Sequence, residues 1–171
     1  MTVLPVRIYP DPVLRTRADE VTRFDADLAR LVDDMMDTMR AHSGAGLAAP
    51  QVGVSLRVFV YECGGESGHI VNPVWRAVDD ETQTGPEGCL SIPDIRAACT
   101  RHMNVVADGV DVTGAPITVD GTEILARCIQ HETDHLDGVL FLARLEPEDR
   151  KQVMRQIRTM AWFTDPASVG S

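Results

Sequence analysis

The sequence lacks the features that would place the chain in a membrane or direct its export. It contains no run of about eighteen apolar residues, the length that a membrane-spanning helix needs. Its opening, MTVLPVRIYP, has no basic start followed by an apolar stretch and a small-residue cleavage site. We therefore expect a cytoplasmic protein that does not act at a membrane.

The cysteines form no CxxC pair. The chain has four of them, spread over a long stretch: Cys63, Cys89, Cys99 and Cys128. Disulfide scaffolds are typical of much shorter secreted domains, so this spacing in a chain of 171 residues argues against one. Metal binding or plain burial explains the cysteines better.

An excess of basic residues is also missing. The formal net charge is −10, which repels the phosphates of nucleic acids, so we expect no direct sequence-specific nucleic-acid binding. The one basic cluster lies near the C-terminus: Arg150, Lys151, Arg155 and Arg158. Its simplest interpretation is a solvated helix face balanced by nearby acids, Glu146, Glu148 and Asp149.

The hydrophobic pattern predicts helices at both ends of a β-rich middle. Apolar residues at three- and four-residue steps predict helices over 25–41 and 123–137, and a third from Pro147 to about residue 162. β-rich runs cover 56–61, 69–74, 75–83, 103–112 and 116–119, with turns at Gly64-Gly65, Gly85-Pro86 and Gly114. We predict one α+β domain over 1–163, with small mixed or antiparallel sheets packed around a central helix, and a loose tail over 164–171.

The central helix carries the sequence HETDH. Because His131 and His135 are four residues apart, they lie on the same helix face and can bind one metal ion. Glu132 is turned about 100° from His131, which suits a general base better than a third ligand. Two solvated histidines on an amphipathic helix are the alternative, so a third ligand has to be found.

Downstream residues do not supply that ligand. A metzincin continues as HExxHxxGxxH, but Phe141 stands where the third histidine belongs, and no histidine follows His135. Glu146 and Glu148 lie at a predicted helix start, where the positive end of the helix dipole favours acidic residues. They are therefore poor candidates for the third ligand.

Cys89, upstream in the segment GPEGCLSIP, is the stronger candidate. In a loop beside small residues, its thiolate would complete a Cys and two-His set and leave a position open for water. A small buried thiol is the alternative, and we favour that interpretation for Cys63, Cys99 and Cys128. A third segment, GAGLAAPQ over 44–51, offers backbone groups that can pair with an extended peptide.

The motifs GAGLAAPQ, EGCLS and QHETDHL, in this order, resemble the three motifs of the peptide deformylases, and the resemblance extends from Tyr9 through about Leu145. It implies that the central helix is the metal-binding helix, with Cys89, His131 and His135 as ligands. It also implies that Glu132 is the general base, while the Gln51 side chain and the Leu90 backbone N–H stabilise the oxyanion. By the same resemblance, Ala45, Gly46 and Cys128 line the substrate pocket.

The implied reaction is removal of the formyl group from the N-terminal formylmethionine of new polypeptides, with release of formate. The implied cofactor is one divalent ion, Fe²⁺ in the cell, with Zn²⁺, Ni²⁺ or Co²⁺ as other occupants after purification. Some relatives dock on the ribosome through a helix at the position of the C-terminal basic cluster, which makes the ribosome a second expected partner.

Two residues depart from the commonest family pattern. Ala45 stands where a valine or isoleucine is frequent, and Arg127 stands where some relatives have an aliphatic residue. These departures keep one alternative open, a deformylase-fold hydrolase that acts on another formylated or acylated amine. A non-catalytic metal- or ribosome-binding module is the other alternative.

Overall fold

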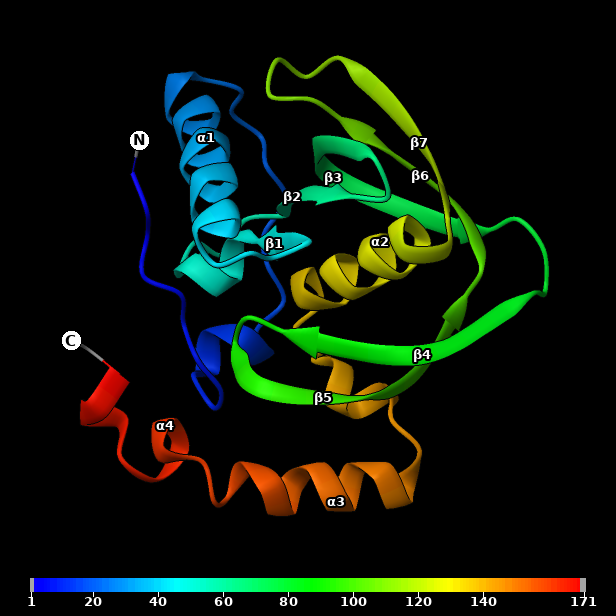
Figure 1. Cartoon of the computed structure of the whole chain (residues 1–171). Coiled ribbons are helices and arrows are strands. Elements are labelled where there is room, and N and C mark those ends of the chain that lie inside the picture. The colour runs from blue at the N-terminus through cyan, green and yellow to red at the C-terminus, as the bar shows by residue number, and fades with distance from the viewer. Residues whose placement is uncertain (1, 170–171) are drawn as a thin grey trace.

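The computed structural model describes residues 2–169 and confirms the predicted α+β class (Figure 1). Its helices are α1 (Ala26–Ala41), α2 (Glu123–Leu136), α3 (Pro147–Ile157) and the short α4 (Ala161–Thr164). Its strands are β1 (Gly46–Ala48), β2 (Val58–Cys63), β3 (Glu66–Ala77), β4 (Thr82–Cys89), β5 (Ile92–His102), β6 (Asn104–Val110) and β7 (Pro116–Thr122). No helix in this part of the chain has the length and apolarity to cross a membrane.

The strands form two antiparallel sheets. One has five strands in the order β1-β2-β3-β6-β7, and the other is the β4-β5 hairpin. The strand β1 forms one edge of the larger sheet, where it pairs only with β2, with Leu47 opposite Val60. An edge strand leaves backbone N–H and C=O groups available to another extended segment.

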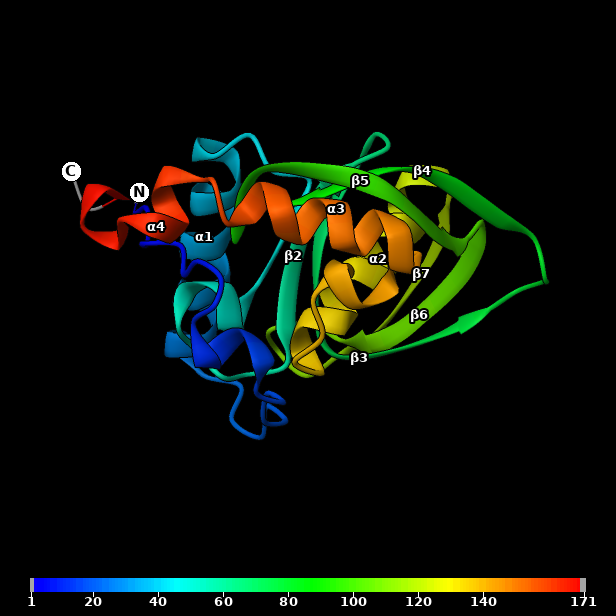
Figure 2. The same cartoon turned by 90° about the horizontal axis from the view of Figure 1, so that it is seen from below.

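Helix α2 runs between the two sheets, with the larger sheet on one side and the β4-β5 hairpin on the other (Figures 1 and 2). Its apolar side chains, including Leu125 and Ile129, pack with Phe59 and Ile70 of the larger sheet. Burial reaches the polar residues too, since every residue from Cys128 to Leu136 is buried. Such a helix is stable only if its polar side chains find partners within the protein.

Helix α1 closely matches its predicted range. Asp25 caps its N-terminus by accepting a hydrogen bond from the Leu28 N–H at 3.1 Å. Val32, Met35 and Met39 occupy its buried face and pack against β1 and β2, so the methionines are core residues. This contact holds β1 beside α2.

The segment between 82 and 102 differs from the prediction. Gly85-Pro86 was expected to be a turn and Cys89 to lie in a loop, but both glycine and proline lie within β4, and Cys89 is its last residue. Proline is tolerated because β4 has only one neighbouring strand, so one of its edges needs no N–H donor. The expected strands 69–74 and 75–83 are also wrong as separate elements, because β3 runs unbroken to Ala77.

The C-terminal helix is shorter than the predicted 147–162. Helix α3 packs on β5 through Val153 and Ile157 and ends at Ile157 (Figure 2). The chain then turns, because Trp162 donates a hydrogen bond to the Pro93 carbonyl at 3.0 Å. Of the tail predicted to be loose, residues 166–169 form a 3-10 turn, and residues 170–171 lie outside the described part.

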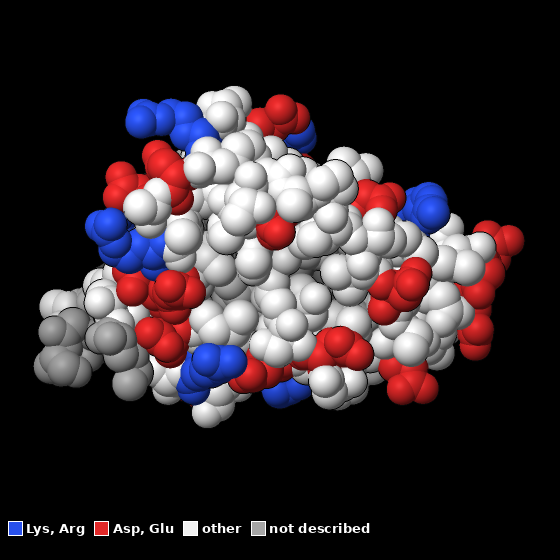
Figure 3. Space-filling model, turned by 90° about the horizontal axis from the view of Figure 1, so that it is seen from above, with Lys and Arg blue, Asp and Glu red and all other residues white. Residues whose placement is uncertain are grey.

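Charge is unevenly distributed on the surface. On the face that Figure 3 shows, most charged groups lie around the rim, where acidic groups cover more of the surface than basic groups, and the middle is largely uncharged apart from one acidic group. This view agrees with the net charge of −10 and offers no basic surface for a polyanion on that face.

Candidate metal centre

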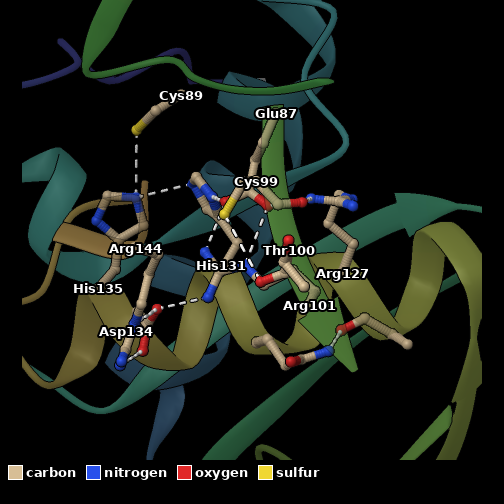
Figure 4. Close-up of polar contacts among 12 residues, drawn as sticks. Glu87, Cys89, Cys99, Thr100, Arg101, Arg127, His131, Asp134, His135 and Arg144 are labelled. Carbon is tan, nitrogen blue, oxygen red and sulfur yellow. Dashed lines mark hydrogen bonds and ion pairs between the residues drawn. The ribbon is translucent and has the colours of Figure 1, made fainter. Parts of the chain in front are cut away.

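The end of β4 and the buried face of α2 bring three potential metal ligands together. The Cys89 sulfur and one ring nitrogen each from His131 and His135 lie within 4.8 Å of one another. Cys89 Sγ is 3.3 Å from His135 Nε2, which is 3.2 Å from His131 Nε2 (Figure 4). Sulfur and imidazole nitrogen are suitable donors for zinc, iron and related ions.

Hydrogen bonding and burial set the orientation and charge of the two imidazoles. Glu87 Oε2 lies 2.7 Å from His131 Nδ1, and a carboxylate only accepts, so Nδ1 donates to Glu87 and Nε2 faces His135. Burial opposes the charged form of His131, but its hydrogen bonds with Cys89 and Glu87 outweigh burial and raise the pKa of His131, whereas burial lowers the pKa of His135 well below its usual value. Two imidazole nitrogens and a sulfur facing one point form a donor set that suits a metal ion.

Glu132 lies beside this cluster but is not part of it. Its side chain is buried, and Oε2 has no hydrogen-bond partner among the described residues. Burial raises the pKa of Glu132 to about 7. A carboxyl group with such a pKa can both accept and return a proton near neutral pH.

Gly46 allows β1 to approach Glu132 closely. A Cβ atom at this position would lie 2.6 Å from Glu132 Oε1 and 2.8 Å from Cys128 Sγ. Both distances are shorter than real carbon contacts allow, so any larger residue would push these side chains away. The glycine of the first motif therefore determines how close the edge strand comes to the cluster.

Gln51 is held in one orientation. Its Oε1 accepts a hydrogen bond from the Ala48 N–H at 2.9 Å, which directs Nε2 to the other side. There Nε2 donates to Ser91 Oγ at 3.1 Å and lies 3.6 Å from Cys89 Sγ. The amide N–H donor of Gln51 therefore points toward the group formed by Cys89, His131 and His135.

A buried ion network surrounds the histidines. Arg101 of β5 donates to Glu87 at 2.6 and 3.1 Å and to Asp134 at 2.7 Å, and Arg144 also binds Asp134 (Figure 4). Burial opposes ionisation of Glu87, but the hydrogen bonds from His131 and Arg101 outweigh it and hold the pKa of Glu87 well below its usual value. The carboxylate that orients His131 is thus ionised.

A cavity of about 460 Å³ opens beside the cluster. All the residues predicted for the site line it except His135, which lies deeper. The predicted lining residues are Ala45, Gly46, Gln51, Cys89, Leu90, Cys128, His131 and Glu132. The residues that the three motifs supply therefore meet in one place, although their roles follow from chemistry and not from position alone.

Sequence reasoning missed the network around Glu87. Glu87 lies two residues before Cys89 in β4, but the pairing of β4 with β5 shifts register between Gly88 and Cys89, so strand alternation alone would not have related the two side chains. The segment was also expected to be a turn and a loop. Phe141, which stands where a metzincin would have its third histidine, stacks on the His131 ring at 6.1 Å between centroids.

Comparison with known proteins gives a consistent result. The family model described as Polypeptide deformylase matches residues 3–151. The chain is 59% identical to "Peptide deformylase 1" of Corynebacterium efficiens and 56% identical to that of Corynebacterium glutamicum, in each case over 95% of this chain and 99% of the relative.

Solved structures agree with the sequence relatives. The crystal structure of a peptide deformylase from Legionella pneumophila superposes with a TM-score of 0.83 at 39% identity, over 90% of this chain and 92% of that one. A plant peptide deformylase gives a TM-score of 0.90 at 34% identity, over 98% and 94% of the two chains.

Glu87→Gln tests the orientation of His131. The substitution keeps the shape of the side chain but removes its charge, so we expect affinity for Zn²⁺ to fall about 10- to 100-fold in competition with a chelator. Glu62→Gln is the matched control, because Glu62 forms an exposed ion pair with Arg40. Equal affinities in the two variants would show that Glu87 does not support the ligand.

Proposed function

The chain belongs to the peptide deformylase family, and from this premise we infer that it is a metal-dependent hydrolase that removes the formyl group from the N-terminal formylmethionine of new polypeptides, releasing formate. One observation carries this inference: Cys89, His131 and His135 lie together beside a cavity that Glu132 and Gln51 line. A hydrolase acting on a different amine is not favoured. Nor is a non-catalytic module, since Glu132 and Gln51 both face the cavity.

We assign the metal ligands to Cys89 Sγ and the Nε2 atoms of His131 and His135. When bound there, a divalent ion supplies Lewis acidity for the formyl carbonyl and lowers the pKa of water to roughly 7. The thiolate and imidazole set is compatible with Fe²⁺, Zn²⁺, Ni²⁺ and Co²⁺. We propose Fe²⁺ as the ion in the cell.

Glu132 is the proton carrier. The water oxygen forms a bond to the formyl carbon, and the proton that the water loses goes to Glu132. When the C–N bond breaks, Glu132 returns this proton to the leaving nitrogen, so formate and a free amine are formed. The buried carboxyl, with its raised pKa and its unpartnered Oε2, suits both steps.

Gln51 and Leu90 stabilise the negative charge that develops on the formyl oxygen. The Gln51 amide donor is already oriented by Ala48, so little reorganisation is needed when the charge appears. Leu90 follows Cys89 directly and lines the cavity, and these two observations support its backbone N–H as the second donor.

The substrate peptide lies along β1. The outer edge of this strand is unpaired in the larger sheet, so an extended peptide can form backbone hydrogen bonds with it next to Gly46. The first side chain then enters the pocket near Ala45 and Cys128. Gly46 permits this arrangement because, without a side chain, it lets the strand lie close to Glu132.

Glu132→Gln tests the catalytic assignment. We expect formate release from a formyl-Met peptide to fall by at least about 10²-fold while metal content is unchanged, because the residue moves protons and is not a ligand. Acetyl-Met and formyl-Leu peptides should react slowly with the unaltered protein. Glu148→Gln, exposed on α3, is the control. Near-normal turnover in the Glu132 variant would exclude its role.

Metal analysis tests the proposed ion. Protein purified without oxygen should contain iron and lose activity in air, because the ion or Cys89 is oxidised. Replacement with Ni²⁺ or Co²⁺ should give activity that survives air. An air-stable zinc protein with full activity after anaerobic purification would contradict the choice of Fe²⁺.

We also propose that the basic face of α3 docks on the ribosome. Arg150, Lys151, Arg155 and Arg158 are all exposed, while the opposite face of α3 is buried through Val153 and Ile157. Lys151 forms an ion pair with Glu148 at 3.3 Å, but both side chains are solvated, so this pair contributes little and can be exchanged. Removal of the whole helix would uncover part of the core.

Charge reversal is therefore the better test. We expect Arg155→Glu with Arg158→Glu to weaken ribosome binding by about tenfold or more at low salt, with formate release from free peptides unchanged. Arg23→Glu with Arg30→Glu, two exposed arginines near the start of α1, makes the same change in net charge elsewhere. Equal binding by the two double variants would refute docking through α3.

A further inference from the structure

Arg127 is a charged residue in the wall of the cavity. It lies on α2, one turn before His131, and lines the cavity together with Pro86, Ile124 and Cys128. These neighbours are apolar or weakly polar, so the guanidinium is the one strong hydrogen-bond donor among them. The side chain is only 12% exposed.

Two acceptors fix this guanidinium in place. Arg127 Nη1 donates to Glu87 Oε1 at 2.8 Å and to the Cys99 carbonyl at 2.9 Å (Figure 4). Glu87 is itself held by Arg101, whose side chain is 4% exposed. Because both acceptors belong to buried parts of the hairpin, Arg127 cannot turn out to the solvent without breaking a buried ion pair.

Part of its donor capacity is unused. Nη1 makes both of these hydrogen bonds, and in the described part of the chain Nε and Nη2 have no hydrogen-bond partner. Because residue 85 is glycine, no Cβ atom contacts Nη2 from β4; a Cβ there would lie 3.9 Å from Nη2, in ordinary van der Waals contact. The cavity therefore has a fixed cation with free N–H groups at its wall.

We propose that Arg127 determines specificity for the first side chain of the substrate, and that it lets the pocket accept an unbranched side chain ending in a neutral hydrogen-bond acceptor, methionine sulfoxide, as well as methionine. Ala45, which also lines the cavity, has a smaller side chain than the valine or isoleucine that is frequent at its position. A carboxylate is disfavoured because Glu87 and Glu132 border the same cavity. This inference rests on the proposed deformylase function.

The test compares formyl-Met, formyl-methionine sulfoxide and formyl-norleucine tripeptides with the same following residues. Norleucine has the length of methionine but no acceptor. In Arg127→Met, we expect the kcat/KM ratio of the sulfoxide to the methionine peptide to fall about 10- to 100-fold, as loss of one hydrogen bond to a charged group predicts. The change should lie mainly in KM, and the norleucine to methionine ratio should stay constant.

Two further variants make the result decisive. Arg96→Met removes an exposed arginine at the same cavity and should leave the sulfoxide ratio unchanged. If Arg127→Met does not fold, the same ratio is measured in Arg127→Lys. The lysine ammonium still neutralises Glu87 but lacks the Nη2 donors, so the sulfoxide ratio should fall in this variant too. An unchanged ratio in the folded variant overturns the proposal.

Failure of the proposed function gives a different result. In that case the unaltered protein releases no formate from the formyl-Met peptide, and both inferences are lost. If it hydrolyses this peptide but its preference does not depend on residue 127, only the specificity role is lost.

Discussion

The carboxylate of Glu87 is the group on which the site depends. It takes part in four short contacts, two with Arg101 and one each with Arg127 and His131, at 2.6 to 3.1 Å. Without these contacts a buried carboxylate would destabilise the fold, because the free-energy cost of desolvating an unpaired charge exceeds the free energy that most single contacts contribute. With them, one residue of β4 orients a proposed metal ligand on α2, a cation of β5 and a residue of the cavity wall.

This arrangement also explains how a polar helix can occupy the centre of the protein. The buried part of α2 contains His131, Glu132, Asp134 and His135, and most of these find partners on the β4-β5 hairpin or the segment after the helix. Two atoms of these residues have no hydrogen-bond partner among the described residues, Oε2 of Glu132 and Nδ1 of His135. The unpaired carboxyl of Glu132 suits the proposed proton carrier, because strong pairing would lower its pKa and weaken it as a base.

Local patterns predicted the helices well and the hairpin poorly. The ranges expected for α1 and α2 agree with the structure within a residue at each end, because apolar spacing reflects the geometry of the helix itself. The hairpin of β4 and β5 was missed because Gly85 and Pro86 are typical of turns. Their place in a strand depends on the single neighbour that β4 has, which no local pattern shows.

The sequence by itself determined that two imidazoles share a helix face, since the four-residue spacing of His131 and His135 follows from helix geometry. Through the resemblance of its motifs to those of the family, it also predicted Cys89 as the third ligand. Only the tertiary structure decided that the sulfur reaches the imidazoles and that Glu87 and Arg101 support them. The physical reason is that such contacts join residues up to 46 positions apart, and they form only when the sheets pack on both sides of α2.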